Sequence, residues 1–479
     1  MKEKLILGFC PTRRFTFSAE DAQKFKKLIQ SFLKGYSDIL EIVDLEDINP
    51  EGLLFDSTEM ADRISEKFLA SHVDAVFVPH CNFGTEDTVA KVCKAVGKPV
   101  LLWGPRDEDP LESGFRLRDT QCGLFATGKV LRRFNVPFTY IPNTSVDDPV
   151  FKRGFENFLR VANVVKAFGK IRILQIGPRP SGFWSVICNE GELIEKFGIQ
   201  IYPISVVEIQ QKTEEIEKSG SDELKAAIEQ IEKTVICKPQ DSDSVRKVAA
   251  LKLAMRYYVD REKCTAVAIQ CWNALQDCMH LMPCLANALL TDEGIPVACE
   301  TDINGAVSEI LAYAAALNET APFLCDLTVR QTTNDNVELL THCGNFPPSL
   351  VPKENKTHFG NHFLFDGHCP GTHEGEIKGG TLTLVRFDGD HGDYQLFLGK
   401  CKGTKGKFSR GTYLYVEVND WPLWETKLVE GPYIHHCAGI HQNVVPVLYE
   451  ACKYIPGLKA DPVDPTEEEI KAWMRGSID

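Results

Sequence analysis

Several signatures that would assign the chain at once are missing from its sequence. It contains no CxxC pair, which argues against a tetrahedral zinc site built from cysteines. It has no GxGxxG turn after a predicted strand and no P-loop, so a dinucleotide-binding role has little support. No apolar run is long enough to span a bilayer. The first residues lack the long apolar segment and cleavage site of a signal peptide, and we interpret residues 4–9 as a strand.

The sequence also lacks an excess of positive charge, because acidic residues outnumber basic ones and the 479 residues carry a net charge of -14. This balance disfavours nucleic acid or an anionic membrane as the main partner. The 17 cysteines lie scattered inside apolar runs, as free cysteines do when they act as small buried hydrophobes. They indicate a reducing compartment, and we therefore predict a cytoplasmic protein.

Apolar strands and helices alternate along the chain up to about residue 350, a length that suits two domains. Strands are predicted in two series, at 4–9, 39–45, 73–79 and 99–103, and then at 172–176, 199–204 and 266–270. Such alternation is typical of parallel, doubly wound sheets. Within the second series, the charged segment 214–233 predicts one long solvated helix.

The pattern changes in the last part of the chain. Alternation with a period of two at 380–387, 394–398 and 412–418 predicts antiparallel strands. The predicted fold class is therefore α/β, with two tandem doubly wound, Rossmann-like domains followed by a β-rich, barrel-like domain that ends in a helix. We place the three domains at 1–168, 169–349 and 350–479.

Three polar residues of the central part, Glu300, Asp326 and His342, each follow a short apolar run. In open α/β sheets, ligand sites lie just past the carboxyl ends of the strands. Two carboxylates and an imidazole at such ends suggest a site for a divalent metal. The alternative is structural, because a carboxylate at a strand end often caps the next helix, and Asp302 or Asn304 stands where that cap is expected.

Histidines cluster twice in the second half of the sequence. His435 and His436 are adjacent on a segment expected to be extended, so they should point to opposite faces and only one could face a given metal. A surface pair without function is the alternative. His368 belongs to a histidine-rich loop whose spacing fits no standard zinc motif. We interpret that loop as a cover over the active site.

Four short segments occur in the order Ala298–Gly305 (ACETDING), Phe323–Thr328 (FLCDLT), Glu338–His342 (ELLTH) and Ile434–His436 (IHH). Together they resemble the L-fucose/L-arabinose isomerase family. The first two are similar to the fucose isomerase segments that carry the metal-binding carboxylates. The last two are similar to arabinose isomerase segments that carry metal-binding histidines.

The resemblance spans most of the chain but follows neither named relative throughout. Asp326 is a fucose-type feature, whereas His342 is an arabinose-type feature, and the predicted β domain is compact. The chain therefore looks like a third, divergent branch. Such branches include isomerases of sugars modified at the far end, such as sulfoquinovose.

The resemblance implies aldose–ketose isomerisation with Mn²⁺ or another divalent cation, held by Glu300, Asp326, His342 and His436. A cation of this kind can polarise a sugar carbonyl, and carboxylate and imidazole ligands suit Mn²⁺. Glu300 and Asp326 are the predicted catalytic residues, which move protons through a cis-enediol. Which of them is the base and which the acid is left open.

The resemblance also implies substrate contacts. Gln270 is similar to a family glutamine that binds sugar hydroxyls, although an amide that caps a helix fits the local sequence as well. Arg13 and Arg14 resemble a loop that reaches a neighbouring subunit's site, where an arginine can pair with a phosphate or sulfonate. Tryptophans could stack on sugar faces, with a core position as their default. The predicted substrate-binding residues are Arg13, Arg14, Gln270, Trp272, His368, Trp421, Trp424 and His435.

The predicted function is thus a metal-dependent aldose–ketose isomerase of a free sugar, whether a hexose, deoxyhexose, pentose or C6-modified hexose such as sulfoquinovose. The family implies a homo-oligomer, a hexamer or trimer, with active sites between subunits, and closed oligomers are usual for soluble enzymes. The alternative is a non-catalytic sugar-binding protein on similar α/β lobes. It would not need the four metal ligands.

Overall fold

The computed structural model describes residues 3–55, 57–365 and 369–476, and it divides the chain into two compact units. Unit 1 comprises Met1–Lys166, Glu450–Tyr454 and Glu468–Asp479, and unit 2 comprises Ala167–Tyr449 and Ile455–Glu467. Each unit is described by itself. The division into three domains at residues 168 and 349 stays a prediction. In the part of the chain that the model covers, no helix is both long and apolar enough to cross a membrane.

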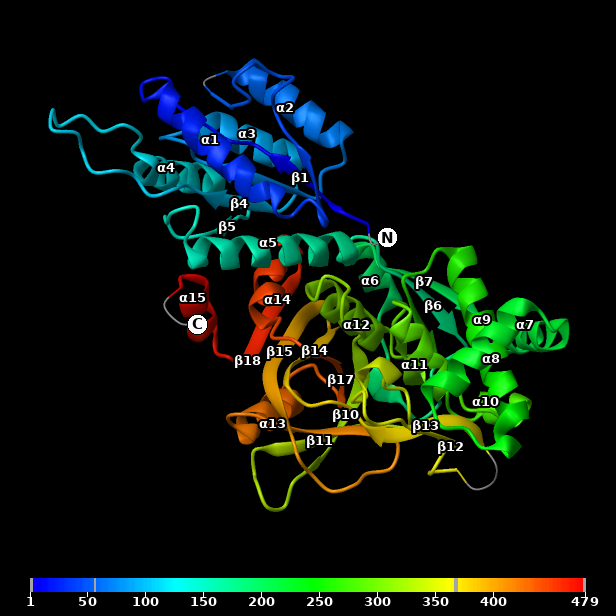
Figure 1. The fold of residues 1–479 in the computed structure, drawn as a ribbon. Helices are drawn as coiled ribbons and strands as arrows, with labels where there is room; N and C mark the ends of the chain where they lie inside the picture. Colours follow the sequence, from blue (N-terminus) through cyan, green and yellow to red (C-terminus); the bar gives the residue numbers. More distant parts are fainter. Residues whose placement is uncertain (1–2, 56, 366–368, 477–479) are drawn as a thin grey trace. The chain divides into compact units, whose positions relative to one another are not determined.

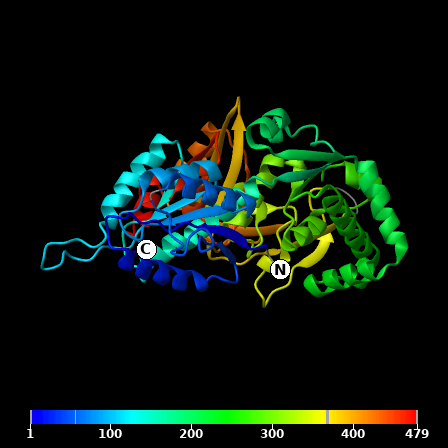
Figure 2. The ribbon, with the colours of Figure 1, turned by 90° about the horizontal axis from the view of Figure 1, so that it is seen from above.

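Unit 1 is built on a parallel sheet of five strands in the order β2-β1-β3-β4-β5 (Figures 1 and 2). The strands are β1 (Leu5–Phe9), β2 (Leu40–Val43), β3 (Ala75–Pro79), β4 (Val100–Trp103) and β5 (Thr139–Tyr140). The helices are α1 (Ala19–Lys34), α2 (Thr58–Ala70), α3 (Glu86–Val96), α4 (Thr120–Arg133) and α5 (Pro149–Phe168). Side chains alternate along β3, so that Phe77 packs in one core with α1 and α5, and Val78 in another with α2, α3 and α4.

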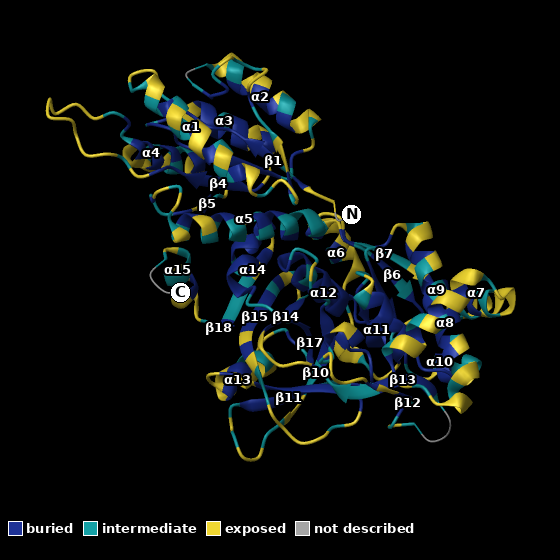
Figure 3. Ribbon diagram, in the orientation of Figure 1, coloured by how far each residue is buried: buried dark blue, intermediate teal, exposed yellow. Residues whose placement is uncertain are grey.

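Unit 2 contains a second parallel sheet, of four strands in the order β7-β6-β8-β9. Its strands are β6 (Arg172–Ile176), β7 (Gln200–Ile204), β8 (Ala266–Ile269) and β9 (Val297–Ala298). Its helices are α6 (Glu190–Phe197), α7 (Val206–Ser219), α8 (Asp222–Thr234), α9 (Ser242–Glu262), α10 (Ala274–Met279), α11 (Cys284–Asp292) and α12 (Ile303–Ala315). Helices α7, α8, α9 and α11 share one hydrophobic core with this sheet. Exposed outer faces of α7 and α8 appear yellow in Figure 3.

The single helix predicted at 214–233 is wrong, because two helices, α7 and α8, meet within that segment. Gly220 ends α7 with a left-handed φ of 57°, which glycine adopts without steric cost. Ser221 then begins α8, since its side chain accepts a hydrogen bond from the backbone N–H of Leu224. The prediction relied on the charge of the segment and overlooked Gly220 and Ser221 as the end of one helix and the start of the next.

The remaining strands of unit 2 form one nine-stranded sheet, in the order β12-β13-β16-β11-β10-β17-β14-β15-β18. Because β15 also pairs with β16, six antiparallel strands close into a barrel (Figure 1). The strands are β10 (Phe323–Arg330), β11 (Val337–His342), β12 (His358–Asn361), β13 (Pro370–Glu376), β14 (Thr381–Asp390), β15 (Asp393–Thr404), β16 (Thr412–Glu417), β17 (His436–Ile440) and β18 (Leu458–Asp464). Helices α13 (Trp421–Glu430), α14 (Val445–Ala451) and α15 (Glu467–Met474) complete the chain. Two parallel α/β sheets and a closed antiparallel barrel confirm the predicted fold class.

Two barrel strands come earlier in the sequence than we predicted. Strand β10 carries Asp326 and β11 ends at His342, so both residues belong to the antiparallel barrel. The prediction that these two residues follow strands of an open parallel sheet is therefore wrong. It holds for Glu300, which follows β9. Short apolar runs cannot distinguish parallel from antiparallel strands, since pairing is a long-range property.

Helix α12 joins the two sheets of unit 2. It contacts β8 and β9 of the parallel sheet as well as β14 and β17 of the barrel. Nearly all of its residues are buried, and its many small side chains allow sheets to approach on several sides. Asp302 begins the helix and accepts a hydrogen bond from the backbone N–H of Gly305. Of the two residues expected to cap this helix, Asp302 is the one that does so.

Trp421 and Trp424 lie in the hydrophobic core of the barrel, on α13. The Trp424 ring is fully buried and packs edge-on against Phe397, with ring centroids 5.4 Å apart. Stacking on a sugar would require this core to open. The prediction that these two tryptophans bind substrate is therefore wrong, and their role is packing.

We expect Trp424→Ala to lower the free energy of unfolding by about 3–5 kcal/mol, as large-to-small core substitutions do. Val429→Ala is the matched control, because Val429 lies on the same helix with 78% of its surface exposed and should cost under about 0.5 kcal/mol. Urea unfolding followed by circular dichroism measures both. Equal effects of the two substitutions would contradict the core position of Trp424.

The protein should lose stability on mild acidification through its buried histidines. Burial lowers the pKa of His373 to about 4, although a backbone hydrogen bond to Phe346 opposes this. The unfolded chain takes up a proton near the ordinary pKa of 6.5 and the folded chain only near 4. Stability is therefore complete above 6.5 and falls as the pH drops towards 4, by about 3 kcal/mol for this one residue.

The loss in unfolding free energy between pH 7 and pH 4.5 should shrink by about 2–3 kcal/mol in His373→Gln, since glutamine takes up no proton. His358→Gln, which changes an exposed histidine on the neighbouring strand β12, should leave that loss unchanged. An identical pH dependence of the unfolding free energy in His373→Gln and the unaltered chain would contradict this explanation.

Candidate active site

Glu300 occupies a strained turn at the carboxyl end of the parallel sheet. It lies in the 3₁₀ turn Cys299–Thr301, between β9 and α12. Glu300 and Thr301 both have left-handed backbones, with φ of 55° and 54°, which non-glycine residues rarely adopt. The surrounding structure must over-determine such a conformation, and strained residues of this kind cluster at functional sites.

Three further polar side chains come from neighbouring barrel strands. Asp326 on β10 and His436 on β17 are direct cross-strand partners, so their side chains leave the same face of the sheet. His342 is the last residue of β11, the strand on the other side of β10. The structure thus brings Glu300, Asp326, His342 and His436 together from four separate segments.

Their ligand atoms converge without bonding one another. Nε2 of His342 lies 3.5 Å from Oε2 of Glu300, and Nε2 of His436 lies 3.9 Å from Oε2 of Glu300 and 3.4 Å from Oδ1 of Asp326. These distances exceed those of ordinary hydrogen bonds. Among the residues that the structure describes, buried Oε2 of Glu300, Oδ1 of Asp326 and Nε2 of His342 have no hydrogen-bond partner. Buried polar atoms left in this way call for an ion or a ligand.

The electrostatics of the cluster favour added positive charge. Burial alone would raise the pKa of Glu300, but the nearby imidazoles, chiefly His342, outweigh it and lower that pKa to about 2. Burial alone would lower the pKa of His342, but the charges of Asp326, Cys299 and Glu300 raise it well above its usual value. A divalent cation would meet the same attraction, and two carboxylates with two imidazoles form a suitable donor set.

The proton on His342 sets a condition for cation binding. Its Nδ1 accepts a hydrogen bond of 2.8 Å from the backbone N–H of Cys343, so a neutral ring carries its proton on Nε2. An imidazole that binds a cation through Nε2 must instead carry the proton on Nδ1. The ring would therefore have to release the Cys343 contact when a cation binds.

Comparisons with known proteins point to sugar isomerases. The family model described as "Fucose/sulfoquinovose isomerase, N-terminal domain" matches residues 8–169. The sulfoquinovose isomerase of Priestia aryabhattai is 25% identical over 399 residues, which cover 82% of this chain and 84% of that relative. The sulfoquinovose isomerase of Alkalicoccus urumqiensis is 25% identical over 396 residues, covering 80% and 84%.

These matches support a place for the chain in the fucose isomerase-like family. The resemblance is a distant one, because the matching relatives share only 25% of the aligned residues with this chain, and their names support a sugar isomerase. Among solved structures, a periplasmic solute-binding protein of an ABC transporter from Actinobacillus succinogenes, with bound D-allose, matches 61% of this chain and 83% of that chain. Its TM-score of 0.17 and identity of 13% are too low to carry an argument.

A buried ion-pair network orients His436. Asp302 accepts a hydrogen bond of 2.9 Å from Nδ1 of His436 and two more from the guanidinium of Arg386 on β14. Burial alone would raise the pKa of Asp302, but Arg386 and His436 hold it well below its usual range. An ionised Asp302 only accepts hydrogen bonds, so the proton of His436 stays on Nδ1 and its Nε2 lone pair faces Glu300 and Asp326.

Arg386 is fully buried and is shared between two carboxylates, since its Nε donates to Asp388 at 2.7 Å. Asp302 was predicted only as a cap, and no role was predicted for Arg386 or Asp388. One signal was available: Arg386 and Asp388 alternate on an otherwise apolar strand, so both face inward. Charged residues on the inner face of a strand indicate a buried ion pair.

The predicted residues Gln270 and Trp272 follow β8, next to the strand that precedes Glu300. The Trp272 ring is half-buried and meets His362 at a centroid distance of 6.3 Å. His362 is buried, and burial followed by the charge of His342 lowers its pKa to about 4. The roles of Gln270 and Trp272 therefore stay predictions.

The arginines predicted to bind substrate have partners inside unit 1. Arg13 donates to Glu51 from Nε at 2.6 Å and from a terminal nitrogen at 2.9 Å, and Arg14 donates to Glu86 at 2.9 Å. A substrate anion would have to replace these carboxylates, and the role of both arginines stays a prediction. The predicted residue His368 lies outside the described residues.

The expectation that His435 and His436 point to opposite faces is wrong. Strand β17 begins at His436, so the alternation of a strand does not extend back to His435. The exposed His435 offers a ring nitrogen within 4.8 Å of ligand atoms of Asp326 and His436, and the two rings lie 4.3 Å apart. His435 thus lies on the solvent side of the same cluster.

Asp302→Asn should weaken Mn²⁺ binding by about 10–100-fold, the usual effect of removing a carboxylate that orients a ligating histidine. Asparagine can donate to Nδ1 and so favours the proton on Nε2 of His436, where it blocks the cation. Isothermal titration with Mn²⁺ measures the change. Asp388→Asn is the control, because Asp388 shares Arg386 but does not contact His436; equal losses in both variants would contradict the orienting role.

Proposed function

We propose that this chain is a metal-dependent aldose–ketose isomerase that moves a proton between C2 and C1 of a free sugar. The observation that supports this most is the convergence of four ligand atoms from four segments, three of them buried without a partner in the described part of the chain. Glu300, Asp326, His342 and His436 would hold the cation. When bound, a divalent cation such as Mn²⁺ would polarise the sugar carbonyl as a Lewis acid.

The two carboxylates divide the proton transfers between them. One takes the proton from C2 of the aldose as the C2–H bond breaks, exchanges it with solvent, and delivers a proton to C1 as the new C–H bond forms. The other moves a proton between the oxygens of the cis-enediol. The low pKa of Glu300 keeps it ionised near neutral pH, as a base requires. Asp326 has 25% of its side chain exposed and so stands on the open side of the cluster.

The barrel and the histidines would fix the geometry of these steps. Asp302 holds the His436 ring in one orientation, and the cross-strand pairing holds Asp326 opposite His436. Trp272 and His362 would border the sugar and exclude water. Fixed groups of this kind lower the barrier because their orientation is set before the substrate reacts.

The names of the relatives suggest which sugar the enzyme would act on. Those with 25% identity are named sulfoquinovose isomerases, so sulfoquinovose is the first candidate substrate. Neutral hexoses, deoxyhexoses and pentoses are the others. In a homo-oligomer, hexamer or trimer, Arg13 and Arg14 of a neighbouring subunit would bind the sulfonate by exchanging it for Glu51 and Glu86.

The deciding experiment is an isomerisation assay in deuterated water. Each candidate sugar is incubated with Mn²⁺-loaded protein, and NMR follows the ketose and its label at C1. We expect turnover with solvent deuterium at C1, loss of activity with EDTA, and recovery with Mn²⁺. Sugar binding without turnover, indifferent to EDTA, would instead support a sugar-binding protein.

Glu300→Gln should lower kcat by about 10²–10⁴-fold, the usual contribution of a general base or acid. Glutamine keeps the shape of the side chain but carries no charge, so it can neither take a proton nor hold a cation well. Glu319→Gln is the matched control, because Glu319 is exposed just beyond the other end of α12. Full activity in Glu300→Gln would exclude the proposed mechanism.

A further inference from the structure

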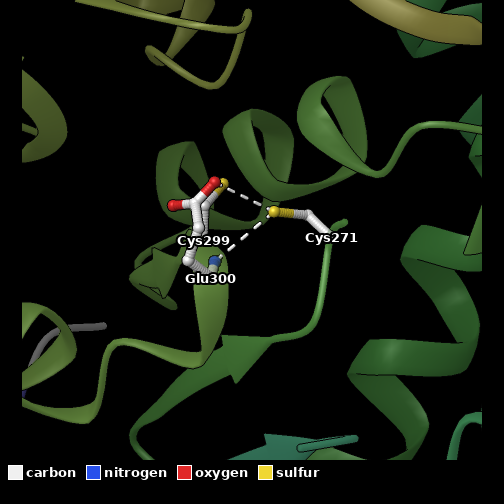
Figure 4. Close-up of side chains that lie close together, drawn as sticks. All are labelled: Cys271, Cys299 and Glu300. Atoms are coloured by element: carbon white, nitrogen blue, oxygen red, sulfur yellow. Dashed lines mark hydrogen bonds between the residues drawn. The ribbon is translucent and has the colours of Figure 1, made fainter. Parts of the chain in front are cut away.

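The two oxygens of Glu300 face different surroundings. Oε2 faces the imidazoles of His342 and His436. Oε1 accepts a hydrogen bond of 3.1 Å from the thiol of Cys271, and the backbone N–H of Glu300 donates to the same sulfur at 3.4 Å (Figure 4). One carboxylate therefore joins a cluster of nitrogen and oxygen atoms to a cluster of sulfur atoms.

Cys299 completes the sulfur side of this arrangement. Both thiols are buried, and the ligand atoms of Cys271, Cys299 and Glu300 all lie within 4.8 Å of one another (Figure 4). The amides of Asn287 and Asn345 donate to the Cys299 sulfur at 3.4 and 3.6 Å. Those two asparagines are buried, and within the described ranges of the chain their Oδ1 atoms have no hydrogen-bond partner.

The dimensions suit a soft cation. Zinc binds thiolate sulfur at about 2.3 Å in tetrahedral sites, so its sulfur ligands stand about 3.8 Å apart. Two sulfurs and one carboxylate oxygen would supply three ligands, and rotation of one asparagine amide would offer an oxygen as the fourth. Thiolates select thiophilic cations, whereas carboxylates with imidazoles suit harder ones. The two sides of Glu300 therefore differ in the cation they prefer.

We propose that Cys271, Cys299 and Oε1 of Glu300 form a second cation site, which takes a thiophilic divalent cation such as Zn²⁺ or Cd²⁺ and thereby switches the enzyme off. The cation forms two bonds to sulfur, the two S–H bonds break, and two protons leave to solvent. No group is oxidised or reduced.

Occupation of this site removes what the reaction needs from Glu300. The carboxylate loses its hydrogen bond from Cys271 and shares its charge with the soft cation. Its Oε2 then holds a hard cation less tightly and is a weaker base, because a bound cation lowers the proton affinity of its ligand. This consequence rests on the proposed function, whereas the site itself does not.

Titration of the whole chain with Cd²⁺ tests the site directly. A sulfur-to-cadmium charge-transfer band should appear in the ultraviolet and saturate at one equivalent, with a cadmium NMR shift that reports two sulfur ligands. Cys271→Ser and Cys299→Ser should each abolish the band. Cys264→Ser should keep the band. Cys264 belongs to the same unit but lies just before the start of β8, whereas Cys271 lies just after its end.

A band that survives in both serine variants, or no band in the unaltered chain, would overturn the site. The cadmium NMR shift keeps the test valid even where a serine variant does not fold, since it needs only the unaltered protein. In the activity assay, one equivalent of Cd²⁺ should stop turnover, and a thiol chelator should restore it. Unchanged turnover with Cd²⁺ bound would overturn the switch. Should no sugar be turned over at all, the proposed function fails and the ultraviolet band still decides on the site.

Discussion

The structure of unit 2 depends on how it accommodates concentrated negative charge away from water. Glu300, Asp302 and Asp388 are all buried close to one another. Moving a carboxylate out of water costs several kcal/mol unless a positive group or hydrogen bonds compensate. Arg386 compensates Asp302 and Asp388. Glu300 instead faces the imidazoles of His342 and His436. Against the effect of burial, the charge of Asp326 chiefly raises the pKa of His342, and the hydrogen bond to Asp302 chiefly raises the pKa of His436.

This difference separates a structural half of the network from a functional half. Arg386 is a permanent cation, so the carboxylates around it are neutralised in every state of the protein. Histidine gains and loses its charge, and an exchangeable proton can yield to a metal ion. The strained turn at Glu300 places a carboxylate among those histidines rather than beside the arginine. The cap residue Asp302 links both halves through Arg386 and His436.

The geometry of the cluster also requires two sheets to meet correctly. Glu300 follows the parallel sheet, whereas Asp326, His342 and His436 belong to the barrel. Helix α12 contacts both, and its first turn begins directly after Glu300. Its buried packing therefore determines how far Oε2 stands from the barrel residues. Small changes in that packing would move the carboxylate relative to the imidazoles.

The local sequence was sufficient for most of the elements and for Glu300, Asp326 and His342, whereas His436 was named through the family resemblance. It was not sufficient for how these parts are assembled. Period-two alternation predicted the barrel strands from residue 380 onwards, while β10 and β11 were assigned to a parallel sheet because their apolar runs fit either pairing. Cys271 and Arg386 gain their roles only from long-range contacts, to Glu300 and Asp302, which no local pattern encodes. His435 shows the same limit, because its direction depends on where β17 begins.

The most direct test of the account is anomalous diffraction from crystals soaked with Mn²⁺, recorded at the manganese absorption edge. One strong peak is expected in each chain, within bonding distance of Oε2 of Glu300, Oδ1 of Asp326 and Nε2 of His342 and His436. A peak elsewhere, or ligand atoms that stay apart with the ion bound by other groups, would contradict it.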